Sequence, residues 1–143
     1  MKCPFCEIPE IRKRKIIENE LASAFLTNIP ITIGHGLVVP KRCVPRFEDL
    51  SAQEIKAILD LGEMIKKALA KAYGAEGFNV AYNENEAAGQ SVHHFHLHIV
   101  PRKENDSGIY QYDPRKFIYR PGNREVSEES ELEAVASEVR KYV

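Results

Sequence analysis

The chain has 143 residues, of which 43% are hydrophobic and 29% are charged, and its formal net charge is −1. This length fits a single domain, expected here over residues 1–143, with a hydrophobic core of useful size. The near-zero net charge gives no reason to expect a nucleic-acid polymer or a membrane surface as a partner. The short basic run at residues 12–15 is expected on a solvent-exposed face.

No apolar stretch of the sequence approaches the length of a membrane span. The first residues, Met1 to Pro4, also lack the apolar region of a signal peptide. The sequence therefore predicts a cytoplasmic location and no membrane partner.

Cys3 and Cys6 form a Cys-x-x-Cys knuckle near the N-terminus, and Cys43 is the third cysteine. An odd number of cysteines in a cytoplasmic chain argues against a disulfide scaffold. The knuckle is typical of half a zinc site or of a redox pair. The redox pair is disfavoured, because such a knuckle opens a helix after a strand and no strand precedes this one. Three free, buried cysteines are the remaining alternative.

Hydrophobic periodicity predicts four strands and two helices. Ser51 and Glu54 form a capping box, the apolar residues that follow have helical spacing, and Gly74 ends this helix. The predicted strands cover residues 22–26, 36–39, 78–82 and 92–100, with Pro101 as the end of the last, and a second amphipathic helix begins at Ser127 or Ser130 and runs to Tyr142. The polar turn at residues 83–90 makes the last two strands antiparallel. The sequence thus predicts an α+β fold with an antiparallel sheet, one long helix and a C-terminal helix.

His94, His96 and His98 alternate with large apolar residues in the predicted strand at 92–100. Successive side chains of a strand point to opposite faces, so the three imidazoles are expected on one face, about 6–7 Å apart. Such a set is unsuited to a core, and histidine changes protonation near neutral pH. The pattern indicates either a three-histidine metal site or a nucleophilic histidine with helpers.

Gly89, Gln90 and Ser91 directly precede this strand and favour the nucleophile. A glycine lets a bound group approach the backbone closely. Gln90 and Ser91 offer neutral side-chain donors, and backbone N–H groups in such a turn hold anions. A donor loop that leads into a histidine strand is suited to phosphoryl chemistry.

Residues 89–100 closely resemble the signature of the histidine triad (HIT) superfamily of nucleotide hydrolases and transferases, in which histidines alternate with apolar residues. Three further segments are similar to family segments in the same order, namely residues 30–41 with the Gly34-His35 pair, residues 45–50 and residues 77–83. The similarity covers about residues 3–106 and implies a HIT-like fold. It implies a single HIT domain with the knuckle at residues 3–6, the triad strand at 92–100 and a C-terminal extension at 103–143.

Residues 44–50 and 86–90 are most similar to the fragile-HIT branch, whose members cleave dinucleoside polyphosphates. The resemblance implies that His96, the middle residue of the triad, is the nucleophile. A carbonyl group that accepts from one ring nitrogen fixes the tautomer in which the other nitrogen attacks. His98 is expected to donate to a phosphate oxygen or to the leaving group, and His35 to support the triad from the neighbouring strand.

The resemblance also implies a set of substrate-binding residues: Thr27, Asn28, Asn83, Gly89, Gln90, Ser91, Val92 and His98. Thr27 stands where the family usually has Asp or Asn, and a hydroxyl cannot accept from both ribose hydroxyls as a carboxylate can. Either Asn28 takes this role or the ribose is held less tightly, so the base preference stays open.

Bacterial members of the family bind zinc with this knuckle, with a histidine after a Pro-Lys-x segment and with the first histidine of the triad. Here Cys43 follows the Pro-Lys-x segment. The resemblance therefore implies a structural Zn²⁺ site of the Cys₃His type made by Cys3, Cys6, Cys43 and His94, with an orienting role as the alternative for His94.

The resemblance implies hydrolysis at the α-phosphate of a dinucleoside polyphosphate, such as diadenosine tri- or tetraphosphate. A nucleotidyl-histidine intermediate then gives a nucleoside monophosphate. Hydrolysis of nucleoside phosphoramidates is one alternative, and a nucleotide-binding sensor or scaffold is another. The family also implies a homodimer, in which the aromatic residues 110–119, with Tyr112 and Tyr119, lie near the partner's active site.

Overall fold

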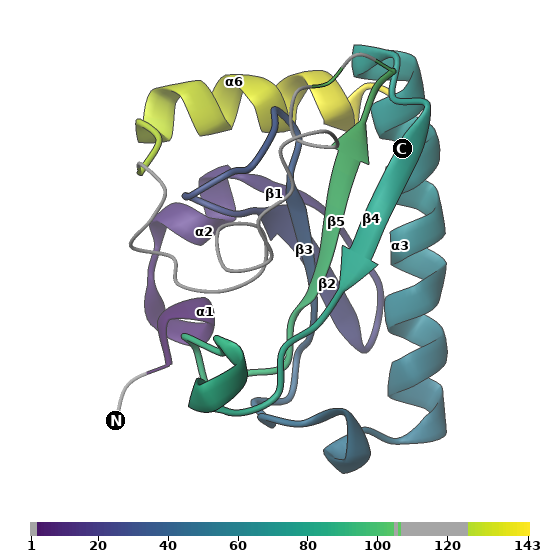
Figure 1. The fold of residues 1–143 in the computed structure, drawn as a ribbon. Helices are drawn as coiled ribbons and strands as arrows, with labels where there is room; N and C mark the ends of the chain where they lie inside the picture. The colour runs from purple at the N-terminus through teal and green to yellow at the C-terminus, as the bar shows by residue number, and fades with distance from the viewer. Residues whose placement is uncertain (1–2, 105, 107–125) are drawn as a thin grey trace.

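The computed structural model describes residues 3–104, 106 and 126–143 (Figure 1). Five strands form one antiparallel sheet in the order β1-β2-β3-β5-β4. The elements in chain order are α1 (Pro4–Glu7), α2 (Glu10–Lys13), β1 (Lys15–Glu18), β2 (Ala22–Leu26), β3 (Gly36–Pro40), the 3₁₀ helix η1 (Phe47–Asp49), α3 (Ala52–Tyr73), β4 (Gly77–Ala81), the 3₁₀ helix η2 (Glu86–Ala88), β5 (Leu97–Arg102) and α6 (Glu129–Arg140). The predicted α+β class with an antiparallel sheet is confirmed. In the described ranges, no helix is both long enough and apolar enough to cross a membrane.

Helical segments cover both faces of β2, so this strand is buried on both sides. Leu26 packs with Ile65 of α3 and Ala136 of α6 in the main hydrophobic core. Phe25 points to the opposite face, because strand side chains alternate, and packs there with Ile11 of α2. In Figure 1, α3 runs along the sheet and α6 lies across its end. The face that carries Phe25 is the one on which the candidate site forms.

The long helix α3 begins and ends as the sequence predicts. The Ser51 hydroxyl accepts a hydrogen bond from the Glu54 amide at 3.1 Å, and the Glu54 carboxylate accepts one from the Ser51 amide at 2.9 Å. This reciprocal pair satisfies two N–H groups at the start of the helix. At the other end, Gly74 adopts a left-handed conformation with φ of 67°, which a glycine reaches without steric cost.

The sequence did not predict β1 or the short helices α1 and α2. The Lys-Ile-Ile-Glu sequence of β1 does not alternate between apolar and polar residues. Its pairing with β2 also shifts register between Lys15 and Ile17, which is typical of a β-bulge. The strand is held by its neighbour and by α6 rather than by a pattern of its own.

The predicted strand at residues 92–100 is wrong at both ends. β5 begins only at Leu97, because β3 pairs with it from Gly36 to Val38 and then separates from it. Pro40 has no N–H to donate to a neighbouring strand, and its carbonyl oxygen accepts a hydrogen bond from His94 Nε2 at 2.7 Å. Two of the three triad histidines therefore lie before the strand, and His98 lies within it.

Pro101 lies inside β5 and does not end it. It pairs with Phe78 of β4, but β3 has already ended on the other side of β5 at this level. A proline is tolerated at such a half-paired position, because one ladder no longer needs its N–H. The carbonyl oxygen of Pro101 instead accepts a hydrogen bond from the Thr32 hydroxyl at 2.9 Å.

The predicted C-terminal helix is confirmed as α6. Its apolar residues Leu132, Ala136 and Val139 are buried in the main core at helical spacing. The predicted aromatic contact of Tyr112 and Tyr119 with a partner subunit falls on residues that lie outside the described ranges.

We expect Glu54 to make the stability of the fold sensitive to acid. Arg42 donates two hydrogen bonds to this buried carboxylate, at 2.8 and 3.2 Å. Hydrogen bonds from Arg42 and from the Ser51 amide lower the pKa of Glu54 from its ordinary 4.5 to about 2. A carboxyl group with a lowered pKa stabilises the folded state above its unfolded pKa, and this contribution is lost as the pH falls towards 2.

Glu54→Gln is therefore expected to lower the free energy of unfolding by about 1–2 kcal/mol at pH 7, and by much less at pH 3. Urea unfolding at the two pH values measures this difference. Glu133→Gln, at an exposed position of α6, is the matched control. An equal loss at pH 3 and pH 7 would contradict the prediction.

Candidate active site

The loop before the triad is held by the side chain of Gln90. Its Nε2 donates to the carbonyl oxygen of Pro45 at 2.8 Å, and its Oε1 accepts from the Asn85 amide at 2.8 Å. Gly89, which precedes it, has a left-handed backbone with φ of 95°, a conformation that favours glycine. Gln90 is buried and supports the loop, whereas the prediction placed it against the substrate.

The chain bends at residues 92–94, and a hydrogen bond from His96 to the backbone of His94 fixes the tautomer of His96. The Phe95 amide donates to the carbonyl oxygen of Val44 at 2.6 Å. His96 Nδ1 lies 2.8 Å from the carbonyl oxygen of His94. A carbonyl oxygen can only accept, so Nδ1 carries the proton. Nε2 of a neutral His96 then has a lone pair and no proton. Burial lowers the pKa of His96, which favours this neutral form.

A second chain of hydrogen bonds fixes His98. The Ile31 amide donates to His35 Nδ1 at 3.1 Å, so the proton of a neutral His35 is on Nε2. His35 Nε2 lies 2.9 Å from His98 Nδ1 and donates to it. This leaves the proton of a neutral His98 on Nε2. His96 and His98 thus present opposite properties at their Nε2 atoms, a base on one ring and an acid on the other.

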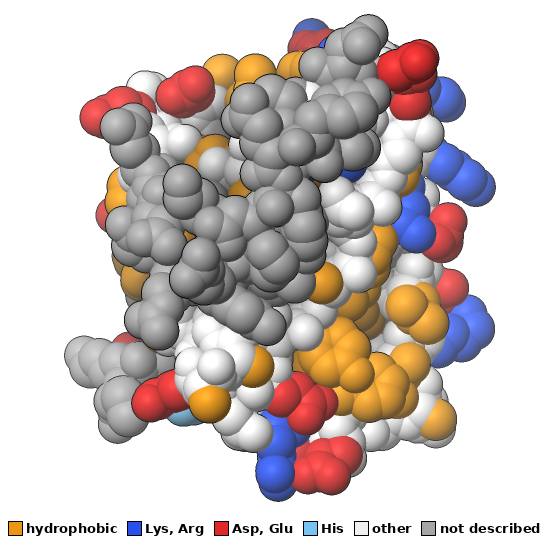
Figure 2. Space-filling model, in the orientation of Figure 1, with side chains coloured by type: hydrophobic (Ala, Val, Ile, Leu, Met, Phe, Trp, Pro, Cys, Tyr) orange, Lys and Arg blue, Asp and Glu red, His pale blue; other side chains and the backbone are white. Residues whose placement is uncertain are grey.

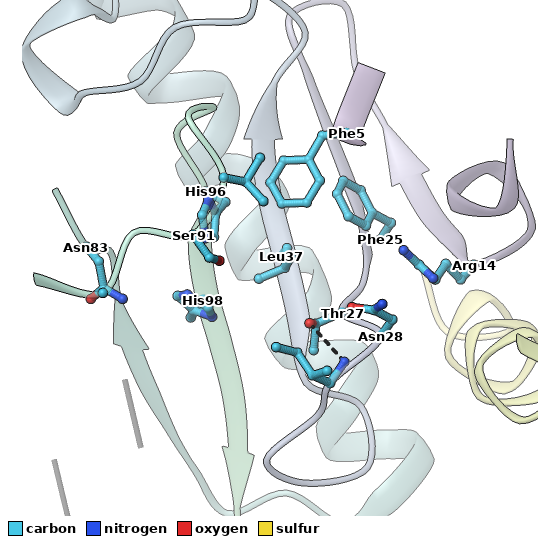
Figure 3. A pocket seen from close by; sticks show the side chains of 13 residues that line it. Phe5, Arg14, Phe25, Thr27, Asn28, Leu37, Asn83, Ser91, His96 and His98 are labelled. Carbon is cyan, nitrogen blue, oxygen red and sulfur yellow. Dashed lines mark hydrogen bonds between the residues drawn. The ribbon is translucent and has the colours of Figure 1, made fainter. Parts of the chain in front are cut away.

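Both rings open into the same pocket. The ring centroids of His96 and His98 are 5.1 Å apart. Figure 3 shows the two histidines beside Ser91 and Asn83, while Thr27 and Asn28 lie across Leu37 from them. The pocket therefore extends from the two histidines on and before β5, across β3, to the end of β2.

Most of the predicted substrate-binding residues line this pocket: Thr27, Asn28, Asn83, Gly89, Ser91, Val92 and His98, together with His96. His35 and Gln90 do not line it, and both act through a neighbour. The Thr27 hydroxyl accepts from the Ile29 amide at 3.3 Å (Figure 3), so its lone pairs are already in part engaged.

The prediction missed five further residues that line the pocket, which are Phe5, Arg14, Phe25, Ile29 and Leu37. Four are apolar and have no sequence signal that separates them from core residues. Arg14 was expected on a solvent-exposed face with the rest of the basic run, yet it is 5% exposed while Arg12 and Lys13 are exposed. Its guanidinium forms an ion pair with the carboxylate of Glu129, which is distant in the sequence, at an N···O distance of 2.7 Å.

The third triad histidine, His94, belongs to a separate cluster with Cys3, Cys6 and Cys43. One ligand atom from each of these residues lies within 4.8 Å of every other. His94 Nε2 donates to Pro40, as above, so Nδ1 has the lone pair, and Nδ1 lies 3.3 Å from Cys3 Sγ and 3.6 Å from Cys6 Sγ. The predicted alternation had placed all three imidazoles on one face of one site.

The donor set of this cluster fits a metal ion. Partial burial and the adjacent Cys3 thiol raise the pKa of Cys6 to about 12, although Cys6 as a whole remains exposed. Crowded thiols without a cation are therefore protonated, and a bound cation reverses this preference. Three thiolates and one imidazole are a tetrahedral set that structural zinc sites use.

Phe5 connects the cluster to the pocket. It lies between the two cysteines of the knuckle, and its ring centroid is 5.7 Å from that of His94 and 5.2 Å from that of His96. Both contacts are edge-on, a favourable geometry for aromatic rings. Phe5 therefore lies in contact with both the cluster and the wall of the pocket that carries His96.

Known proteins similar to this chain agree with this geometry. A HIT-like protein of Mycoplasma genitalium is 42% identical over 109 residues, which cover 75% of this chain and 77% of that protein. The adenosine 5'-monophosphoramidase of Schizosaccharomyces pombe is 38% identical over 111 residues, covering 76% and 80%. The bis(5'-adenosyl)-triphosphatase of Dictyostelium discoideum is 33% identical over 135 residues, covering 91% and 86%.

A solved structure is also similar to this chain. The Zn-bound histidine triad family protein of Mycobacterium smegmatis has a TM-score of 0.72 and 29% identity, and the match covers 99% of this chain and 95% of that one. The family model described as the HIT domain matches residues 8–105. This match spans more than half of the sequence and includes both His96 and His98, so the chain belongs to the HIT family.

Proposed function

We propose that this protein is a nucleotide hydrolase that cleaves dinucleoside polyphosphates at the α-phosphate, with His96 as the nucleophile. One observation carries the proposal: the hydrogen bond of His96 Nδ1 to the His94 carbonyl leaves the Nε2 lone pair beside His98 in the pocket. The relatives named as a triphosphatase and a phosphoramidase support a hydrolase of phosphoanhydride or phosphoramidate bonds.

In the first step, His96 Nε2 forms a bond to the α-phosphorus, and the bond from phosphorus to the bridging oxygen breaks. The leaving nucleotide departs with that oxygen, and His98 Nε2–H donates to it or to a non-bridging oxygen. In the second step, a water molecule attacks the same phosphorus and releases one proton to the solvent, and the N–P bond breaks. A nucleoside monophosphate leaves and His96 returns to its neutral form, so one difficult displacement becomes two easier ones.

Two groups near the pocket support this chemistry. Ser91 and the loop around Gly89 offer donors to the non-bridging oxygens, where charge develops in the transition state. His35 is a positioning residue, because its donated proton holds the His98 tautomer that can act as a donor. A backbone carbonyl holds the His96 ring and the His35 side chain holds the His98 ring, which lowers the cost of reorganisation during the reaction.

Hydrolysis of a nucleoside phosphoramidate is the second candidate, and the Schizosaccharomyces pombe relative favours it. The same attack on phosphorus then releases an amine. A nucleotide-binding sensor or scaffold is the third candidate. A turnover panel of diadenosine triphosphate, diadenosine tetraphosphate and an adenosine phosphoramidate distinguishes the three, because a sensor turns over none of them at a useful rate.

His96→Ala is expected to lower kcat by several orders of magnitude while nucleotide binding survives. The nucleophile contributes mainly in the transition state, so its loss affects kcat far more than Kd. Steady-state turnover of the preferred substrate and calorimetric binding of the product measure the two effects. A wild-type reaction that is quenched by denaturation should also hold an acid-labile nucleotidyl group.

His93→Ala is the matched control, since His93 is the neighbouring histidine, is exposed, and lies 3.3 Å from Glu86 outside the pocket. Its turnover should equal that of the wild type. A His96→Ala variant with more than a tenth of the wild-type rate, or a label on serine or lysine, would refute the mechanism.

We further propose that the cluster of Cys3, Cys6, Cys43 and His94 holds a structural Zn²⁺ ion. A zinc ion at this place ties the N-terminal knuckle to the segment after β3 and to the bend before β5. The Zn-bound histidine triad family protein of Mycobacterium smegmatis supports zinc as the metal. A reducing compartment such as the cytoplasm keeps the three thiols available as ligands.

Purified protein is therefore expected to hold one equivalent of zinc per chain. Cys43→His should keep the metal, because imidazole is an equivalent ligand at this position, whereas Cys43→Ala should lower zinc content and Tm together. Metal analysis and thermal unfolding give the readouts. Unchanged zinc content in Cys43→Ala would remove Cys43 from the ligand set.

We also propose a homodimer formed along β4. This strand is at the edge of the sheet, where unpaired backbone groups invite a second chain. Val80 and Tyr82 are 44% and 40% exposed there, and Figure 2 shows hydrophobic side chains gathered beside and below β4. Leu59 and Met64 on α3 are also exposed.

Val80→Lys is expected to shift the protein to a monomer at micromolar concentration, because it places a charge in the proposed interface. Val126→Lys, at another exposed valine, should remain dimeric. Light scattering after size exclusion measures both masses. A monomeric wild-type protein at this concentration would contradict the proposal.

A further inference from the structure

We infer that Arg14 is a specificity-determining residue that reads the edge of the nucleobase and selects guanine over adenine. This inference rests on the proposed function, since it takes the α-phosphate to lie at His96. Figure 3 shows Arg14 at the end of the pocket opposite His96 and His98, with its guanidinium directed towards Phe25 and Asn28.

The position of Arg14 follows from the order of groups along the pocket. The phosphate of a bound nucleotide lies beside the histidines, so its ribose crosses Leu37 towards Thr27. The base then reaches Phe25, whose ring forms an edge-on pair with Phe5 at a centroid distance of 5.2 Å, while Phe5 also contacts His96 on its other side. These rings supply an apolar wall for a flat heterocycle, and Arg14 supplies the cation at its edge.

Part of the bonding capacity of Arg14 is unused. Its side chain is 6% exposed, and a terminal nitrogen donates to Glu129 Oε1 at 2.7 Å. Its buried Nε has no hydrogen-bond partner among the described residues, and the same holds for two nitrogens of the buried Arg102. Arg14 differs from Arg102 because it lines the pocket. An arginine has five N–H donors, so the acceptors of a pocket ligand would meet the terminal nitrogens of Arg14, since Nε itself is sealed from the pocket.

Guanine is the base that suits these donors. Its O6 and N7 atoms are adjacent acceptors, which a planar guanidinium contacts with two parallel hydrogen bonds. Adenine has an N6 amino group beside N7, and its protons repel a cation that already faces them. Glu129 holds the guanidinium from α6, so the fork is oriented before the nucleotide binds.

Isothermal titration with guanosine and adenosine 5'-monophosphates tests the inference without turnover. Wild-type protein is expected to bind the guanine nucleotide at least about fivefold more tightly, as one bidentate contact implies. Arg14→Met should remove this ratio, mainly by weakening guanine binding. Arg14→Lys should remove it too, because lysine keeps the charge and its ion pair but has no planar fork.

Arg12→Met is the matched control, since Arg12 is an exposed arginine on α2, which ends directly before Arg14, and does not line the pocket. It should keep the wild-type ratio. Equal affinities of the wild type for the two nucleotides would overturn the inference even if every variant failed to fold. Equal weakening of both nucleotides by Arg14→Met, with recovery in Arg14→Lys, would also overturn it in favour of a phosphate contact.

The two proposals fail in different ways. Turnover without a base preference refutes the role of Arg14 and leaves the hydrolase intact. An Arg14-dependent preference in binding, in a protein that hydrolyses no nucleotide, refutes the hydrolase alone. If the wild type binds neither nucleotide, the proposed recognition of the base by Arg14 is refuted.

Discussion

The hydrogen bond from His96 Nδ1 to the carbonyl oxygen of His94 is the constraint on which the site depends. It joins two residues that are two positions apart, where the chain passes from the bend at residues 92–94 towards β5. The bend brings the Nε2 lone pair of His96 into the pocket in a neutral and buried ring.

His94 connects this bend to the rest of the molecule. Its carbonyl oxygen holds His96, its Nε2 donates to Pro40 at the end of β3, and its Nδ1 faces the cysteine cluster. Three separate features thus converge on one buried residue. In the proposed site, a Zn²⁺ ion on Nδ1 would fix this ring, and the ring would in turn hold the backbone that orients His96. The cluster would then support the proposed catalytic geometry from outside the pocket.

Local sequence signals predicted the parts of the fold that local interactions decide. The capping box at Ser51 and Glu54 and the glycine at position 74 set both ends of α3, and each acts within a single turn of the chain. The alternation at residues 92–100 was misleading for a physical reason. Phe95 remains buried in the main core although it lies outside the strand, so the apolar pattern of a strand continues through the bend.

The candidate site shows the same division. The residues that carry the proposed chemistry are adjacent in the sequence or lie in recognisable segments, so a motif identifies them. Gln90 was expected to contact the substrate, whereas its side chain bonds the carbonyl oxygen of Pro45 and the amide of Asn85. Hydrogen bonds to backbone groups cannot be recognised from the sequence, because every residue has these groups. The apolar wall made by Phe5, Phe25 and Leu37 has the composition of a core and becomes a binding surface only when the sheet is assembled.

Arg14 is the clearest case of a role that only the tertiary structure reveals. Its neighbours Arg12 and Lys13 are exposed, so the charge run is for the most part what its sequence indicates. Arg14 differs because β2, the pocket and Glu129 of α6 enclose it. The residues of the proposed chemistry thus lie mostly in one contiguous segment, whereas the proposed selection of the nucleotide depends on Arg14 and Glu129, which come from opposite ends of the chain. On this proposal, substrate preference can change at these two residues while the histidines stay as they are.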